Sequence, residues 1–142
     1  MTFIVDRPPV IVDASVVVAL MTEGRPGLTS AWAGWATEGR QRLAPPLLLP
    51  ETGNALLHGA RLEAGEAVAI VVGLEGSGLE IADRGLDGLV DAIRLAERHG
   101  LTVYDALCLQ LAIDVDGSLA TYDKALARAA AAEEVELEPL GD

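Results

Sequence analysis

The stretch VIVDASVVVAL, residues 10–20, sets the fold of this chain. It opens with three β-branched residues that end at Asp13, and a second apolar run, 14–21, follows without a break. Periodicity alone does not separate strand from helix in an apolar run of this length. We interpret the first run as a short buried strand and the second as a helix, so that Asp13 follows the carboxyl end of the strand.

Segments typical of strands and of helices alternate along the rest of the chain. Further strands are predicted at 42–46, 79–81, 118–121 and 135–140. Helices are predicted at 28–37, 50–62, 66–74, 86–99, 103–113 and 123–132. Such alternation through short loops indicates a parallel sheet that is covered by helices on both faces. We therefore expect an α/β fold in which residues 1–142 form a single domain.

Length and composition agree with one water-soluble domain. The chain has 142 residues, which suits one domain better than two, and 51% of them are apolar. No apolar run approaches the roughly 18 residues that span a bilayer, and residues 1–9 carry charges and prolines where a signal peptide would be hydrophobic. The single cysteine, Cys108, lies in an apolar run and is interpreted as a buried core residue. We expect a soluble, cytoplasmic protein that does not bind membranes.

The net charge argues against a nucleic-acid partner. The chain carries 22 acidic and 10 basic residues, which gives a formal net charge of −12. Phosphate binding normally depends on clustered lysine and arginine. Divalent cations held by several of the carboxylates would weaken this objection, because they invert the local electric field.

Four acidic residues stand where predicted strands end or where the following helices begin. Asp13 follows the first strand, Asp123 follows the fourth, and Glu51 and Asp105 fall in the first turns of helices. Each has a structural explanation, since acids at helix N-termini accept hydrogen bonds from free amides and interact favourably with the helix dipole. For any one of them taken alone, helix capping is the stronger interpretation.

Taken together, the four acids predict a metal site. In a parallel α/β sheet the carboxyl ends of the strands, and the helix starts that follow them, lie along one edge. Carboxylates gathered there would repel one another, which raises some of their pKa values unless a cation is present. Mg²⁺ or Mn²⁺ accepts such oxygen ligands together with retained water. A site of this kind activates water for attack on a phosphodiester.

Four segments give the chain a resemblance to a known family. They are VIVDASVVVAL (10–20), LAPPLLLPETGNALL (43–57), LTVYDALCLQLA (101–112) and SLATYDKALARAA (118–130). With these segments in this order, the chain resembles the PIN-domain family and, more narrowly, the VapC-type toxins of toxin–antitoxin systems. The resemblance implies a single PIN-like α/β domain and a Mg²⁺- or Mn²⁺-dependent endoribonuclease that cleaves RNA phosphodiesters.

The same resemblance implies roles for individual residues. The metal-binding and catalytic residues would be Asp13, Glu51, Asp105 and Asp123. Ser15, Asn54 and Thr121 would orient either the substrate or the water on the metal. Their structural alternatives stay open: a helix cap for the serine, a solvated helix surface for the asparagine and a strand end for the threonine.

Three partners are expected from the resemblance: an RNA substrate, a cognate antitoxin whose tail fills the acidic groove, and a second copy of the chain. A homodimer also agrees with Trp32, Trp35 and the apolar segment 67–74, which offer more hydrophobic surface than one small sheet needs. Packing in the core is the alternative role for the two tryptophans.

Other interpretations of the sequence remain open. A PIN-like domain that binds without catalysis would show the same four acids. A receiver-like signalling domain also has acids at strand ends, but it needs an acidic pair beside the first strand, where Asp13 stands alone. Asp114 or Asp116 is an alternative member of the site. No motif selects one class of RNA over another.

Overall fold

The structure is a computed structural model that describes residues 7–141. Its four strands form one parallel sheet in the order β3-β2-β1-β4. The strands are β1 (Val10–Val12), β2 (Arg42–Ala44), β3 (Leu79–Ile81) and β4 (Ser118–Ala120). The helices are α1 (Ala14–Thr22), α2 (Pro26–Thr37), α3 (Leu48–Asn54), the π-helix η1 (Ala55–Gly59), α4 (Ala64–Leu74), α5 (Gly85–His99), α6 (Val103–Asp114) and α7 (Lys124–Ala132). The predicted α/β fold is confirmed. The domain expected over 1–142 also includes residues 1–6 and 142, which lie outside the described part.

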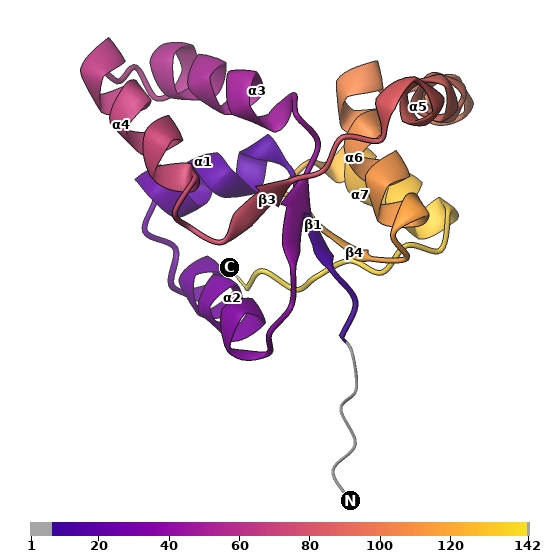
Figure 1. Cartoon of the computed structure of the whole chain (residues 1–142), viewed down its shortest axis with the longest axis horizontal. Coiled ribbons are helices and arrows are strands. Elements are labelled where there is room, and N and C mark those ends of the chain that lie inside the picture. Colours follow the sequence, from indigo (N-terminus) through magenta and orange to yellow (C-terminus); the bar gives the residue numbers. More distant parts are fainter. Residues whose placement is uncertain (1–6, 142) are drawn as a thin grey trace, which may run out of the picture.

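Different helices cover the two faces of the sheet (Figure 1). Helices α1 and α2 pack in one apolar cluster, and α5, α6 and α7 pack in the other. The middle strand β1 contributes to both clusters, because side chains alternate across a strand. Ile11 packs against α5–α7, whereas Val10 and Val12 pack against α1 and α2. All three are fully buried, which explains why this strand is an unbroken apolar run.

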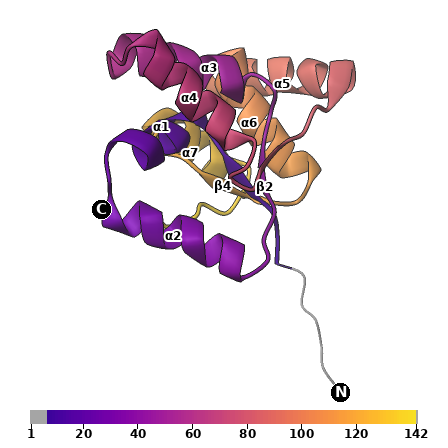
Figure 2. The same ribbon diagram turned by 60° about the vertical axis from the view of Figure 1, so that its left-hand side comes forward.

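The strand order creates a binding edge at the carboxyl ends of β1 and β4. From β1 the chain winds outward to β2 and β3, and it then returns through α5 and α6 to pair β4 with the free side of β1. In open α/β sheets, ligands bind beyond the carboxyl ends of strands at such a reversal. Figure 1 shows α3 and α5 on opposite sides of this edge, and Figure 2 shows the α3–α4 hairpin standing at the same end of the molecule.

The helices between β2 and β3 differ from the prediction. Helix α3 begins at Leu48, so Pro50 is its third residue, where a backbone N–H has no partner within the helix. The helix expected over 50–62 divides into α3 and η1. The break expected at 64–65 comes earlier, because a capping box between Glu63 and Glu66 starts α4 at residue 64.

The strand predicted at 135–140 is wrong as an extended element. Leu137 forms only an isolated parallel bridge with Leu119. The N–H of Glu138 donates to the Leu119 carbonyl at 2.9 Å. The Leu119 N–H donates to the Glu136 carbonyl at 2.9 Å on the other side of this bridge, and the pairing ends after these two hydrogen bonds.

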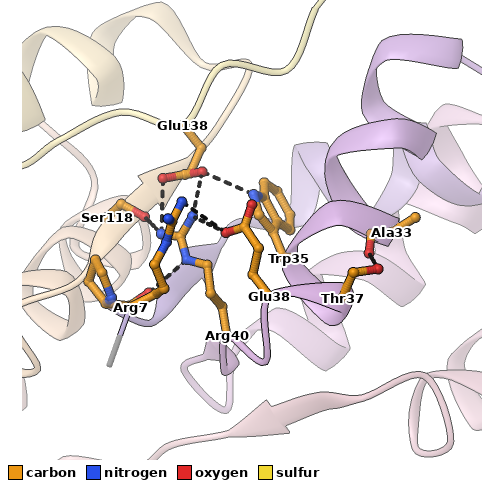
Figure 3. Close-up of polar contacts among 9 residues, drawn as sticks. Arg7, Ala33, Trp35, Thr37, Glu38, Arg40, Ser118 and Glu138 are labelled. Atoms are coloured by element: carbon orange, nitrogen blue, oxygen red, sulfur yellow. Dashed lines mark hydrogen bonds and ion pairs between the residues drawn. The ribbon is translucent and has the colours of Figure 1, made fainter. Parts of the chain in front are cut away.

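A buried ion pair lies at the opposite, amino edge of the sheet (Figure 3). Arg40 precedes β2 and donates to both carboxylate oxygens of Glu138, at 3.0 and 3.1 Å. It also donates to the Ser118 hydroxyl at 3.2 Å, while the Trp35 indole donates to Glu138 at 2.9 Å. Burial alone would raise the pKa of Glu138, but the hydrogen bonds and the charge of Arg40 lower it below the ordinary range. We call these four residues the arginine cluster.

The expected hydrophobic surface is only partly exposed. Trp35 is buried, which confirms core packing for this residue, and Trp32 is half-buried beside it. On α4, Val68 and Val72 remain 59% and 64% exposed. Within residues 7–141, no helix combines the length and the apolar character that crossing a membrane requires.

Candidate active site

The four acids singled out in the sequence line one cavity at the carboxyl edge of the sheet. Its volume is ≈ 200 Å³. We call it the acid pocket, and its lining residues are Asp13, Ala14, Ser15, Leu48, Glu51, Asp105, Cys108 and Asp123. The acids come from the β1–α1 junction, the first turns of α3 and α6, and the β4–α7 junction. The fold therefore brings together four acids that are far apart along the chain.

Asp13 is the most buried of the four acids, and hydroxyl groups hold its carboxylate. Its Oδ1 accepts hydrogen bonds from the Ser15 hydroxyl at 2.5 Å and from the Val16 amide at 3.2 Å. Its Oδ2 accepts a hydrogen bond from the Thr121 hydroxyl. The Ser15 oxygen in turn accepts from the Tyr122 N–H at 3.1 Å. These contacts fix the orientation of the Asp13 side chain and join β1 to the end of β4.

Helix capping and membership of the acid pocket coincide in two of the acids. Asp13 caps α1, and Asp123 caps α7 by accepting a hydrogen bond from the Leu126 N–H at 2.9 Å. In α6 the cap is Thr102, whose hydroxyl oxygen accepts from the Asp105 N–H at 3.1 Å. The Asp105 carboxylate is therefore not explained as the helix cap.

Within residues 7–141, no arginine, lysine or histidine side chain forms an ion pair with the acids of the acid pocket. Burial, followed by the charges of Asp105 and Asp13, raises the pKa of Glu51. Burial and then the charge of Asp123 raise the pKa of Asp105. Burial also raises the pKa of Asp13, although its hydroxyl partners oppose the shift. Asp105 is thus coupled to all three of the other acids.

The chemistry of the donors suits a hard divalent cation such as Mg²⁺ or Mn²⁺, because the charged donors are all carboxylate oxygens. Across the part of the chain that the structure describes, however, no three Asp, Glu, His or Cys side chains are grouped so that they could hold a metal ion. Mg²⁺ retains several waters and needs only one or two carboxylates. The acid pocket therefore fits a hydrated cation better than a dehydrated ion enclosed by all four acids.

The remaining sequence candidates lie outside the acid pocket. Asn54 is exposed at the end of α3 and does not line the cavity. Asp114 accepts a hydrogen bond from the Gln110 amide at 3.0 Å and pairs with Arg84. Asp116 is exposed on the turn that follows α6. Neither of these two aspartates replaces one of the four acids in the cavity.

Three apolar residues of the lining were not predicted, and the first of them, Ala14, directly follows Asp13. Leu48 lies three residues before Glu51 and Cys108 three residues after Asp105, spacings that place each pair on one helix face. This spacing was the available signal in the sequence. Cys108 is buried, as predicted, and burial raises its pKa well above the ordinary value, so the thiol stays protonated.

The chain belongs to the PIN domain family, whose model matches residues 10–132. This match confirms the predicted family and sets aside the receiver-like alternative. A comparison with curated proteins found no match.

Solved structures resemble this chain over most of its length. PAE2754 from Pyrobaculum aerophilum is 26% identical, with a TM-score of 0.65 over 86% of this chain and 84% of that one. VapC20 from Mycobacterium tuberculosis, a sarcin-ricin loop cleaving toxin, is 19% identical, with a TM-score of 0.68 over 84% and 94%. VapBC2 from Rickettsia felis, solved with a DNA fragment from its promoter, is 16% identical, with a TM-score of 0.68 over 91% and 96%. At identities this low, the last two show a likeness of fold alone.

Proposed function

We propose that this protein is a metal-dependent endoribonuclease and the toxin of a type II toxin–antitoxin pair. The observation that carries the proposal is the acid pocket, in which four acids without a balancing cation meet at the carboxyl edge of a PIN fold. VapC20, which shares this fold, is a sarcin-ricin loop cleaving toxin, and this supports RNA as the class of substrate.

The side chains of the acid pocket divide into two roles. The groups assigned to cation binding are Asp13, Glu51, Asp105 and Asp123. A bound Mg²⁺ or Mn²⁺ supplies Lewis acidity to the scissile phosphate and lowers the pKa of the attacking water. Ser15 and Thr121 are positioning residues, because their hydroxyls hold the Asp13 carboxylate. Asn54 lies outside the cavity, so its proposed role is limited to contact with the substrate.

Cleavage of single-stranded RNA by the purified protein, with Mg²⁺, Mn²⁺ or EDTA, tests this function. Asp13→Asn, prepared identically, exposes contaminating nuclease. Asp91→Asn removes an exposed acid from α5 and is the charge-matched control. We expect metal-dependent cleavage by the wild type and by Asp91→Asn, and a loss of about 100-fold or more in Asp13→Asn. Equal cleavage by the wild type and Asp13→Asn would overturn the catalytic assignment.

A non-catalytic PIN-like binding module is the second candidate. The observation that favours it is that, within residues 7–141, no three Asp, Glu, His or Cys side chains are grouped so that they could hold a metal ion. Intact RNA under every condition, with transfer, ribosomal and messenger RNA each offered as substrate, would move the assignment to this alternative.

An antitoxin partner belongs to the proposal. A toxin–antitoxin complex from Klebsiella pneumoniae, 18% identical with a TM-score of 0.59 over 80% of this chain and 86% of that one, shares the fold. We expect the tail of the antitoxin to enter the acid pocket, where a basic side chain would compensate the buried acids. Addition of the antitoxin should then abolish cleavage and displace bound Mn²⁺.

We also propose that the protein forms a homodimer through α4 and η1. Leu57, Val68 and Val72 leave 41%, 59% and 64% of their surfaces exposed around one apolar groove. Exposed apolar patches of this kind usually mark a partner surface. Light scattering should give the mass of a dimer for the wild type and of a monomer for Val72→Lys. Ile93→Lys, at an equally apolar exposed site on α5, is the matched control.

A further inference from the structure

A second cavity lies at the carboxyl edge of the sheet and has a volume of ≈ 280 Å³. Its walls come from the turn after β2, the loop 82–85 after β3, the start of α5 and one side of α6. We call it the side cavity. It takes no part in the cation-binding role proposed for the acid pocket.

The side cavity and the acid pocket share two walls. Leu47 lines the side cavity, and the next residue, Leu48, lines the acid pocket. On α6, Leu107 lines the side cavity and Cys108 the acid pocket. The two cavities therefore lie on either side of the start of α3 and of helix α6, with consecutive residues of each element lining one and the other.

The lining of the side cavity is mainly apolar, with a few polar groups. Leu107 and Leu111 of α6 line the cavity together with Pro45. Arg84 contributes a guanidinium group from a side chain that is half exposed. The nitrogen of the Gln110 amide donates to Asp114 at 3.0 Å, which leaves the amide oxygen as an acceptor for a ligand.

This combination matches the chemistry of a nucleobase. A base has two flat apolar faces, which pack on aliphatic side chains or stack on a guanidinium plane, and a polar edge that forms hydrogen bonds. Binding sites for small ligands likewise combine an apolar lining with a few placed polar groups. Asp83 also lines the cavity, where its carboxylate accepts a hydrogen bond from the Gly85 N–H at 2.8 Å, and Arg84 pairs with Asp114 at 3.5 Å, so Arg84 offers a ligand the plane of its guanidinium group rather than a free charge.

We propose that the side cavity binds one unstacked nucleobase of the RNA, the base next to the phosphate that is cleaved at the acid pocket. The proposal rests on the proposed function. Arg84 stacks on the base, and the Gln110 amide contacts its polar edge. These two residues determine which base is accepted beside the scissile bond.

Oligoribonucleotides in which one nucleotide at a time is abasic test this proposal. In the wild type, one abasic position beside the cleaved bond should lower kcat/KM by about 5- to 100-fold, the usual contribution of one stacked base. In the double variant Arg84→Gln/Gln110→Leu, this loss should shrink to less than about twofold, because the base no longer has its partners. An undiminished abasic effect in the double variant, or no sensitive position in the wild type, would overturn the proposal.

Arg94→Gln is the control for the removal of charge, since this exposed arginine lies on α5, whose first turns line the side cavity. It should keep the abasic effect of the wild type. Unfolding in urea checks that the double variant is folded, so that a lost effect reports the cavity and not the stability of the domain.

Binding without cleavage separates this proposal from the proposed function. Methyl NMR signals of Leu89, Leu107 and Leu111 should shift with adenosine 5′-monophosphate and not with ribose 5-phosphate, even if no RNA is cleaved. The same signals should not move in Arg84→Gln/Gln110→Leu. Shifts with N-acetyl-leucine amide alone would assign the cavity to a protein side chain and overturn the proposal, as would the absence of shifts with all three probes.

Discussion

The two edges of the sheet bury charge in opposite ways. At the amino edge, the arginine cluster surrounds Glu138 with donors, and the pKa of this carboxyl is lowered. At the carboxyl edge, hydroxyl groups hold Asp13 but no cation balances it, and the pKa values of three acids are raised. The carboxylate at the amino edge has an arginine partner within the chain, whereas the acids at the carboxyl edge take part in none of the ion pairs among residues 7–141.

We interpret the paired carboxylate of Glu138 as a charge that stabilises the fold, and the unpaired acids of the acid pocket as charges that bind a ligand. Removing one partner of a buried ion pair is strongly destabilising, because the other charge is left buried without compensation. Acids gathered without a partner destabilise the fold by their repulsion, and such arrangements occur at functional sites. Changes at the amino edge should therefore affect stability, and changes at the carboxyl edge should affect binding and activity.

The largest expected effect is the loss of stability in Arg40→Met. The variant leaves the Glu138 carboxylate buried without its ion pair, which costs about 3–5 kcal/mol. Urea unfolding measures this change. Arg98→Met removes an arginine that pairs with Glu133 from a side chain that is 60% exposed, and it should cost less than about 1 kcal/mol. Equal losses in the two variants would contradict the structural role of the arginine cluster.

A divalent cation should have the next largest effect, and it acts at the other edge. At 100 times its Kd, Mg²⁺ or Mn²⁺ stabilises the folded state by about 2.7 kcal/mol, which raises the melting temperature. Asp105→Asn should abolish this rise, because Asp105 is coupled to all the other acids of the pocket. Without metal, the melting temperature of Asp105→Asn should hold or rise, since repulsion is relieved. A cation effect that survives the substitution would place the ion elsewhere.

A smaller effect is expected from hydroxyl groups at the two edges. Thr121→Val removes a donor to Asp13 and should lower kcat about tenfold, as loss of a group that orients a metal ligand does. Ser118→Ala removes an acceptor for Arg40 and should lower the free energy of unfolding by about 1 kcal/mol with no change in kcat. A lower kcat in Ser118→Ala, or an unchanged kcat in Thr121→Val, would show that activity does not depend on the carboxyl edge alone.

The smallest expected effect is the pH dependence of stability without metal. The raised pKa values of Asp13, Glu51 and Asp105 mean that the folded state takes up protons first, so the free energy of unfolding rises as pH falls from neutral through these values. The contribution of Glu138 is present above its ordinary value of 4.5 and is lost as pH falls through its lowered pKa. Urea unfolding should therefore show a maximum on the acid side of neutral, and saturating Mg²⁺ should remove the rise. A free energy of unfolding that only decreases as the pH is lowered from neutral would contradict this account.

The candidate site could be predicted from the sequence because parallel strands impose it. Once Asp13 and Asp123 are assigned to strand ends and Glu51 and Asp105 to helix starts, the topology alone brings them to one edge. The structure adds what local patterns do not contain. It shows that the hydroxyls of Ser15 and Thr121 contact the carboxylate of Asp13 rather than standing beside it independently.

The arginine cluster could not be predicted in the same way. Arg40 and Glu138 are 98 residues apart and each looks like an ordinary surface charge in its local sequence. The predicted terminal strand failed for a related reason, since the segment around Leu137 is held by a side-chain ion pair and one bridge rather than by a ladder. The side cavity, built from two loops and two helices, likewise leaves no periodic signal.

The separation of Arg40 from Glu138 also orders the events of biosynthesis. A ribosome that has just added Arg40 to the chain must add another 98 residues before the partner of this charge exists. At ~5–20 residues per second this takes on the order of 5–20 s, during which the amino edge of the sheet cannot close. The nascent chain therefore already carries all four acids of the acid pocket before the ion pair between Arg40 and Glu138 at the opposite edge can form.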